Sequence, residues 1–259
     1  MHYQPPGLLE RVSRKVQRAH ARARPYAFLD IPPDMRRVSF CFDDFPKGAR
    51  EGAEILERHN AHGTFYVCFG VLETESDSGP LASAQDVRDM AARGHEIGCH
   101  TFDHMLCCSV SARQAEESCI RNREEAATHG LTLKHFAYPE GELNIRTKRV
   151  IADSYDTART VLKGVNQGRT DAHYLKAAPL YETDYSDIRA LIVRTGKEGG
   201  WLILCTHDIA ETPSQYGTPA AIFEELVRLC MDHDIAIAPV GDVVAEIKQK
   251  AALHKGAEP

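Results

Sequence analysis

The stretch RVSFCFDDF, residues 37–45, joins a short apolar run directly to two adjacent aspartates. β-Branched and aromatic side chains in such a run favour a buried β-strand, and the carboxylates begin where the strand is expected to end. Helical spacing of apolar residues follows it, as in Ala49, Ala53 and Leu56. Seven more strand-like runs lie along the chain: GTFYVCF (63–69), HEIGCH (95–100), LKHFAYP (133–139), DTART (156–160), YLKAAPL (174–180), WLILCT (201–206) and DIAIAPV (234–240).

Strands that alternate with helices along a chain are typical of parallel sheets with crossover helices. We therefore predict an α/β fold, a distorted and incomplete (β/α) barrel with seven or eight parallel strands, for which 259 residues suffice. An open doubly wound sheet is the alternative, but neither a G-x-G-x-x-G nor a P-loop motif follows a predicted strand. The expected boundaries are a basic helical extension over 1–30, the barrel over 31–250 and a flexible tail over 251–259.

Composition excludes several classes of protein. With 43% hydrophobic and 26% charged residues and a net charge of -6, the chain is globular and has no overall attraction to nucleic acid. No apolar run reaches the length of a transmembrane helix or a signal-peptide core, so we expect a cytoplasmic protein. The eight cysteines form no C-x-x-C pair and are expected to be reduced and buried.

Basic residues crowd the first 37 positions, from Arg11 to Arg37. The simplest interpretation is a solvated basic helix. Contact with an anionic surface or with a lipid-linked substrate is the alternative.

Polar residues collect where the predicted strands end. Because the carboxyl ends of parallel strands build the active site of a barrel, we expect these residues to converge. His95 and Trp201 begin their strands instead and are expected to stabilise the opposite rim. The strand ends carry Asp43 and Asp44, His100 to His104, Tyr138 to Gly141, Arg159, and His207 with Asp208.

The stretch HEIGCHTFDH, residues 95–104, places His100 and His104 four positions apart. Such a pair is a weak signal by itself. With Asp44 arriving from another strand end, it becomes a plausible two-histidine, one-carboxylate site that suits zinc, with iron and cobalt as alternatives. Neighbouring strand residues point to opposite sides, so Asp43 can face a substrate while Asp44 binds the metal.

Four motifs in this order, FCFDDF (40–45), HTFDH (100–104), FAYPEG (136–141) and LILCTHD (202–208), resemble the motif series of the polysaccharide deacetylase (NodB homology) family, carbohydrate esterase family 4. The resemblance implies a distorted (β/α) barrel that removes N-acetyl or O-acetyl groups from sugars with one divalent metal ion, usually Zn²⁺. It implies Asp43 as catalytic base, His207 as catalytic acid, and Asp44, His100 and His104 as metal ligands. The substrate expected is an N-acetylhexosamine polysaccharide or oligosaccharide of bacterial origin.

The chain departs from the family pattern at three positions. Phe45 replaces the usual glycine after the aspartates, and Ala137 replaces the arginine that normally partners the base. We predict that Arg159, which ends the neighbouring strand, supplies the missing cation. Glu140 stands where the family often has a tyrosine, but a backbone N–H that helps to hold the oxyanion survives this change.

Other assignments concern the surroundings of the site. The loops 70–82 and 211–219 are expected to carry substrate specificity. Tyr138 and Tyr216 are candidates for stacking on a sugar ring. A family motif with aspartates and a pocket tryptophan has no clear match, so Asp184 and Asp208 are only candidates for the carboxylate that tunes His207.

A narrower resemblance links FAYPEG, RTVLKGVNQGRTDAHYL (159–175) and HDIAETPSQYGTP (207–219) to bacterial exopolysaccharide deacetylases, including holdfast-adhesin deacetylases. It implies a cytoplasmic enzyme, peripheral to the inner membrane, that acts on a lipid-linked glycan. One alternative is an amidase on the same scaffold that cuts a cyclic imide or ureide. The other is a catalytically silent carbohydrate-binding protein, against which the complete set of five site residues argues. The oligomeric state stays unpredicted.

Overall fold

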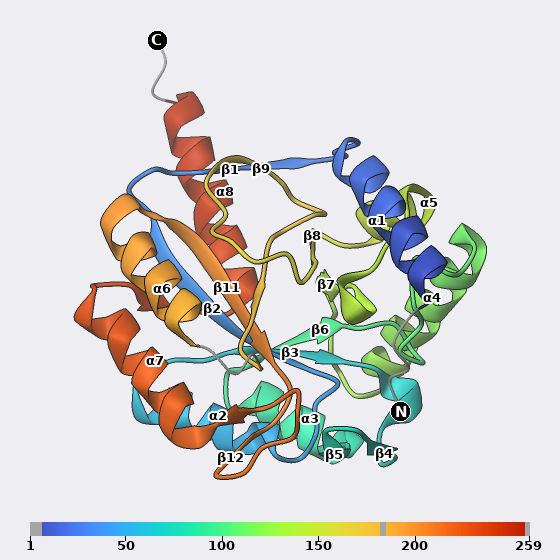
Figure 1. The fold of residues 1–259 in the computed structure, drawn as a ribbon, viewed down its shortest axis with the longest axis horizontal. Coiled ribbons are helices and arrows are strands. Elements are labelled where there is room, and N and C mark those ends of the chain that lie inside the picture. Colours follow the sequence, from blue (N-terminus) through green and yellow to red (C-terminus); the bar gives the residue numbers. More distant parts are fainter. Residues whose placement is uncertain (1–6, 182–184, 257–259) are drawn as a thin grey trace.

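A computed structural model describes residues 7–181 and 185–256. Its central feature is a curled sheet of parallel strands in the order β10, β11, β2, β3, β6, β7, β8 (Figure 1). Each of these strands overlaps a run that the sequence predicts as a strand, which confirms the incomplete parallel barrel. The strands are β2 (Arg36–Asp43), β3 (Thr64–Val67), β6 (Glu96–Cys99), β7 (His135–Ala137), β8 (Thr157–Arg159), β10 (Ala178–Pro179) and β11 (Gly200–Thr206).

The eighth predicted strand is β14 (Ala236–Ile237), which pairs with the beginning of β2. β3 pairs with the end of β2, so the short strands β14 and β3 pair with different parts of the long strand β2. At the other side of the sheet, the segment that contains Ala172 and Leu175 bridges the gap between β8 and β10. The N–H of Ala158 donates to the carbonyl of Ala172 at 2.9 Å, and that of Leu175 donates to Ala158 at 3.0 Å.

Helices cover the outer face of the curled sheet (Figure 1). Their apolar stripes, with Leu56 and Phe223 as examples, pack against the strands in the larger of two hydrophobic cores. Capping boxes at Ser83, Ser111 and Asn144 begin three of them. The helices are α2 (Ala49–Arg58), α3 (Ala84–Ala92), α4 (Ala112–Thr128), α5 (Ile145–Ser154), α6 (Ser186–Glu198) and α7 (Ala220–Asp232).

The second core fills the interior of the sheet, and α8 (Val240–Gly256) closes it at the end where the strands begin. Val243 and Ile247 of this helix are buried together with Trp201, whose indole N–H donates to Ser39 Oγ at 3.0 Å. Trp201 thus lies on the rim where the sequence places it. His95 is buried at the same end, between the backbone N–H of Gly63 and the carboxylate of Glu57.

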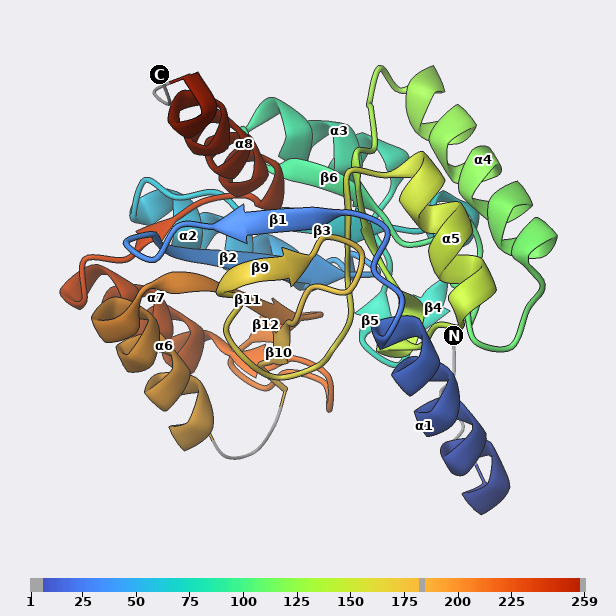
Figure 2. The ribbon, with the colours of Figure 1, turned by 90° about the horizontal axis from the view of Figure 1, so that it is seen from above.

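The terminal segments differ in part from the expected boundaries. The basic extension forms α1 (Leu8–Arg22), but the chain then enters β1 (Phe28–Ile31), which crosses the expected boundary and pairs antiparallel with β9 (Gly168–Asp171) (Figure 2). Sequence analysis does not identify this ribbon, because both strands have only four residues and β9, with the sequence GRTD, has no large apolar side chain. α8 continues through residues 251–256, so this part of the expected tail is helical. Within the described part of the chain, no helix combines the length and apolar character needed to cross a bilayer.

Buried Glu96 anchors the start of α8. Its carboxylate accepts hydrogen bonds from the N–H of Gly241 at 2.9 Å and from Thr64 Oγ1 at 2.8 Å, and it lies 3.5 Å from His135 Nε2. Burial raises the pKa of Glu96 from 4.5 to about 7, against the opposing effect of these hydrogen bonds. The folded state therefore holds this proton more tightly than the unfolded chain does.

The raised pKa of Glu96 predicts that the unfolding free energy of the protein depends on pH. The stabilisation from its protonation is complete below pH 4.5 and is lost as the pH rises through about 7. Compared with Glu96→Gln, which stays neutral, the wild type should lose up to about 3 kcal/mol of unfolding free energy over this window. Urea unfolding of both proteins near the two ends of the window measures the difference. Equal pH dependence in the two proteins would contradict the assignment.

Candidate active site

A cavity of about 390 Å³ lies at the end of the sheet where the strands finish. Its lining brings together all five residues that the sequence proposes for catalysis and metal binding, from three different strand ends. Ser76 to Ser78 and Tyr216 also reach it, so each predicted specificity loop contributes to the cavity. The complete lining is Arg14, Asp43, Asp44, Ser76, Asp77, Ser78, His100, His104, Glu140, Glu142, Val161, Tyr181, His207 and Tyr216.

A sharp backbone turn separates the two aspartates. Asp43 ends β2, and Asp44 and Phe45 then adopt left-handed conformations with φ of 60° and 56°. Such a conformation costs a residue with a Cβ about 1 kcal/mol or more, which gives a physical reason for the family's glycine at position 45. Phe45 is fully buried and packs on Phe65 with 4.8 Å between ring centroids, so burial offsets the strain.

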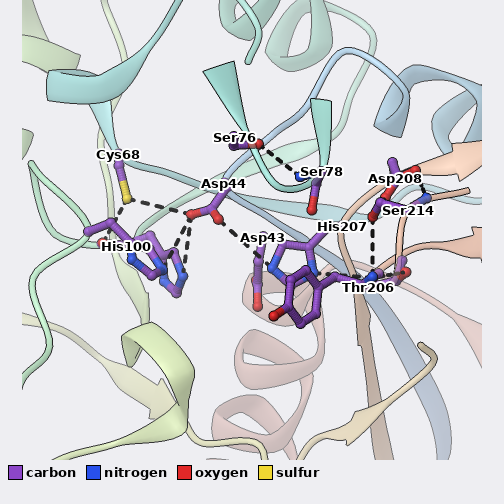
Figure 3. A network of polar contacts seen from close by, with 12 residues as sticks. Asp43, Asp44, Cys68, Ser76, Ser78, His100, Thr206, His207, Asp208 and Ser214 are labelled. Atoms are coloured by element: carbon purple, nitrogen blue, oxygen red, sulfur yellow. Dashed lines mark hydrogen bonds and ion pairs between the residues drawn. The ribbon is translucent and has the colours of Figure 1, made fainter. Parts of the chain in front are cut away.

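Asp44, His100 and His104 form a compact set of possible metal ligands. Figure 3 shows Asp44 and His100 of this set pointing toward each other. One ligand atom from each lies within 4.8 Å of the others. Asp44 Oδ1 is 3.8 Å from His100 Nε2 and 3.6 Å from His104 Nε2. These separations are long for hydrogen bonds and close to the roughly 3.4 Å between neighbouring ligands of a tetrahedral zinc ion with bonds of about 2.05 Å. The donor set therefore fits a divalent ion of this kind.

Hydrogen bonding prepares His100 as a ligand. Its Nδ1 donates to the carbonyl of Ala137 at 2.8 Å, which leaves Nε2 unprotonated and directed at Asp44. Burial lowers the pKa of His100 to about 4, although Asp43 and Asp44 oppose the shift. His100 is consequently neutral near pH 7, as metal binding requires.

Asp44 is held in its charged form. Burial by itself would raise the pKa of this carboxyl, but His104, His100 and His207 outweigh that effect and lower it. The His100 to His104 turn is fixed from α4, because Ser118 Oγ accepts from the N–H of Phe102 and donates to Asp103. The turn that carries His100 and His104 therefore has a defined position.

Arg159 forms an ion pair with Asp43 through Nη2. Its guanidinium is 1% exposed and lies 4.7 Å from the centre of the Tyr66 ring. Burial would lower the pKa of Arg159, but the charge of Asp43 outweighs it and raises the pKa, so the side chain stays cationic. Ala137, at the family's arginine position, is the register partner of Arg159 between β7 and β8. The cation that pairs with Asp43 therefore comes from β8 and not from β7, at the same level of the sheet.

His207 follows β11 and packs against two aromatic rings, which also contact each other. The centroids of Tyr181 and Tyr216 are 5.7 Å and 5.5 Å from the imidazole. Its Nδ1 is 3.3 Å from the carbonyl of Tyr216, and its Nε2 is 3.8 Å from Asp44 Oδ2 (Figure 3). Among the described residues, a backbone carbonyl thus orients this histidine.

The proposal that Asp208 tunes His207 is wrong. The carboxylate of Asp208 accepts hydrogen bonds from the N–H of Ser214 at 2.8 Å and from Ser214 Oγ at 2.5 Å. Through these two hydrogen bonds Asp208 holds the 211–219 loop. Its side chain points away from His207, because successive side chains of an extended chain point to opposite sides. The other candidate, Asp184, lies outside the described residues.

The proposed sugar-stacking role of Tyr138 is also wrong. Its side chain is fully buried in the outer core beside Phe136, and its hydroxyl donates to the carbonyl of His173 at 3.3 Å. The alternation of side chains along the strand directs Phe136 and Tyr138 outward and Ala137 inward. Glu140, by contrast, lines the cavity and has a left-handed backbone with φ of 55°.

Arg14 and Tyr181 line the cavity but escape sequence analysis. Arg14 comes from α1 and donates to Glu140 at 2.7 Å, across 126 positions of sequence. No local pattern marks such a distant partner. Tyr181 directly follows the run 174–180 that the sequence predicts as a strand, so its place at a strand end was a usable signal.

Residues 30–156 match the polysaccharide deacetylase family model, whereas no curated protein matches the chain significantly. One similar structure is the Bc1960 peptidoglycan N-acetylglucosamine deacetylase, with a TM-score of 0.58, 14% identity and coverage of 83% of this chain and 91% of the other. A family 4 acetyl xylan esterase from Clostridium thermocellum, in complex with a cobalt ion, aligns with a TM-score of 0.57 and 19% identity, over 81% of this chain and 91% of the other.

The shared fold also extends to a protein without activity. A CE4 family pseudoenzyme from Bacillus anthracis aligns with a TM-score of 0.53 and 11% identity, over 82% of this chain and 66% of the other. Fold alone therefore does not decide activity. The match of residues 30–156 to the family model shows that this chain belongs to the polysaccharide deacetylase family, and the match together with the esterase and deacetylase neighbours supports a deacetylase hydrolase.

Proposed function

We propose that this chain is a metal-dependent N-deacetylase that hydrolyses the acetamide group of N-acetylhexosamine residues in a bacterial polysaccharide. One observation carries the proposal: Asp43, with its buried Arg159 partner, shares a cavity with the possible metal ligands and with His207. A protein that only binds sugars has no need for a buried ion pair beside a metal site and a second titratable group.

In this proposal Asp44, His100 and His104 hold one divalent ion, most suitably Zn²⁺, because two imidazoles and a carboxylate are ligands that zinc accepts. When bound, such an ion lowers the pKa of water toward about 7 and polarises the acetyl carbonyl. The cobalt ion in the structurally similar esterase supports a divalent metal on this fold.

The side chains of the cavity then have separate tasks. Asp43, oriented by its ion pair with Arg159, accepts a proton from the attacking water. The backbone N–H of Glu140 donates to the former carbonyl oxygen of the acetyl group, on which the negative charge develops as water adds to the carbonyl carbon. His207, whose Nδ1 faces the Tyr216 carbonyl, donates a proton from Nε2 to the departing nitrogen as the C–N bond breaks. Acetate and a free amino sugar leave.

The cavity suits one sugar unit better than a large ligand. Its volume of about 390 Å³ lies near the lower end of small-molecule sites. Tyr181 and Tyr216 add aromatic surface beside His207, which suits the apolar face of a sugar ring or the methyl group of an acetyl. The rival substrate, a cyclic imide or ureide, would use the same metal and base.

The experiment that tests the function is acetate release from N-acetylglucosamine oligomers by purified protein, with added zinc and with chelator. Zinc-dependent release that exceeds any turnover of cyclic imides and ureides supports N-deacetylation. Turnover of a ureide without acetate release would favour the rival amidase. Binding of oligomers without release by a zinc-loaded protein would identify a silent carbohydrate-binding protein.

Arg159 is expected to matter for turnover and not for metal binding. Arg159→Ala should lower kcat by about 10²-fold, the lower end of what a general base contributes, because Asp43 loses the cation that orients it. Zinc stoichiometry should stay near that of the wild type, since Arg159 contacts no proposed ligand. Arg159→Lys, which keeps the charge, should recover part of the rate. Unchanged kcat in Arg159→Ala, measured where the variant is folded, would refute the role.

The cellular part of the proposal is a cytoplasmic enzyme that acts on a lipid-linked glycan at the inner membrane. The narrower family resemblance supports it, and the basic composition of the first 37 residues is compatible with it.

A further inference from the structure

Ion pairs and a buried contact hold one face of α1 against the rest of the protein. Arg14 pairs with Glu140 at 2.7 Å, and Arg18 pairs with Glu142 one turn further along the helix. Ala21 is fully buried near the end of the helix, and its carbonyl accepts from Lys148 Nζ at 2.7 Å. These contacts extend over two turns, so the protein holds the helix in a fixed orientation.

The outward face of α1 carries a stripe of large apolar side chains. Leu8, Leu9, Val12 and Val16 are 78%, 87%, 55% and 48% exposed. At about 100° per residue, these four positions fall within one arc of roughly 100°. Scattered exposed hydrophobic residues are ordinary, but a continuous stripe on a helix held in place marks an interaction surface.

Basic side chains border this apolar stripe. Arg11, Lys15 and Arg22 are exposed and lie along one of its edges. Glu10 is the only acidic residue of the helix, and it pairs with Arg14 on the inward side. The outward surface of α1 is therefore apolar and cationic, without a negative charge of its own.

We propose that the outward face of α1 docks on an anionic lipid bilayer. An apolar stripe flanked by Lys and Arg is the pattern with which interfacial helices enter the boundary between head groups and acyl chains. A second copy of this chain is a poorer partner, because paired helices would bring their basic edges together. Nucleic acid would satisfy the charges but leave the leucines and valines in water.

Docking in this orientation brings the catalytic cavity to the membrane. Arg14 lies on the opposite face of the same helix and lines the cavity, so only the thickness of α1 separates the apolar stripe from the cavity wall. A glycan chain tethered to lipid would enter the cavity beside the surface that holds its anchor. This consequence depends on the proposed deacetylase function, whereas docking itself does not.

Co-sedimentation of the full chain with vesicles tests the proposal. We expect binding to phosphatidylcholine vesicles that contain phosphatidylglycerol, weaker binding to phosphatidylcholine alone, and release by high salt. The double variant Leu9→Ser, Val12→Ser should lower vesicle affinity at least about tenfold, because it removes apolar contacts from the stripe. Lys15→Glu should lower it at least about fivefold through lost attraction to anionic lipid.

Matched control variants separate docking from general effects. Met231→Ser removes an apolar side chain that is 49% exposed on α7, and Lys197→Glu reverses a charge on α6. Both should bind vesicles as the wild type does. Acetate release from soluble oligomers should be unchanged in all four variants, so a failure of docking is distinguishable from a failure of the proposed function.

Two results would overturn the proposal. One is no binding of the wild type to vesicles of either composition. The other is a dimer in sedimentation equilibrium that Leu9→Ser, Val12→Ser disrupts while vesicle binding is absent, which would assign the stripe to a second copy of the chain.

Discussion

Asp43→Asn should lower kcat by about 10²- to 10⁴-fold while the protein still binds one metal ion, because an amide cannot accept the proton that the proposed mechanism gives to the carboxylate. The fold should survive, since the amide oxygen of asparagine can still accept from Arg159. Acetate release and zinc content of the same preparation measure the two effects. Wild-type activity in this variant would refute Asp43 as the base.

The neighbouring residue supplies the matched control. Asp44→Asn makes the same chemical change one position later, but it removes a charged oxygen from the proposed ligand set. Its zinc content should fall together with its activity, whereas Asp43→Asn should lose activity alone. If both variants kept their zinc, or if both lost it, the division of roles between the two aspartates would be wrong.

His100→Ala and His104→Ala should each lose most of the bound zinc and, with it, almost all activity. Each substitution leaves two protein ligands where the proposed site has three, and zinc sites in enzymes normally have three protein ligands. Competition with a chromogenic chelator measures the affinity of each variant. Stoichiometric zinc at wild-type affinity in both variants would show that the site lies elsewhere.

His95→Asn is the control for the loss of a buried histidine. His95 lies at the opposite end of the sheet, where it bonds with Gly63 and Glu57, outside the cavity. Losing these contacts should cost about 1 to 3 kcal/mol of unfolding free energy. Zinc content and kcat should stay near the wild type, which separates ligand loss from destabilisation.

The fold and the central site follow from local patterns in the sequence. All eight predicted strands are present, because each is a short run with apolar or β-branched residues, a signal that needs no distant partner. The convergence of Asp43, Asp44, His100, His104 and His207 could also be predicted, since the carboxyl ends of parallel strands meet at one end of a barrel. Their catalytic and ligand roles stay proposals until the variants are measured.

Positions beside the strands were less predictable. Tyr138 lies two positions before Glu140 and Asp208 directly follows His207, both of which line the cavity, yet Tyr138 is buried in the outer core and Asp208 binds Ser214. A shift of one residue along an extended chain turns a side chain to the other face. Sequence proximity to a motif is therefore a poor guide to which side chain enters the cavity.

The sequence by itself determined the parallel barrel, the positions of its strands along the chain and the cluster of polar residues at their ends, because all three depend on periodicity and on chain direction. The sequence also predicts Arg159 as the partner of Asp43, and the register of β7 and β8 sets Arg159 level with Ala137, where it pairs with Asp43. The tertiary structure alone decided the contribution of α1. Arg14 reaches the cavity because α1 packs against α5 and forms ion pairs with Glu140 and Glu142. Such contacts depend on strand register and helix packing, which the whole fold sets and which no local stretch of sequence encodes.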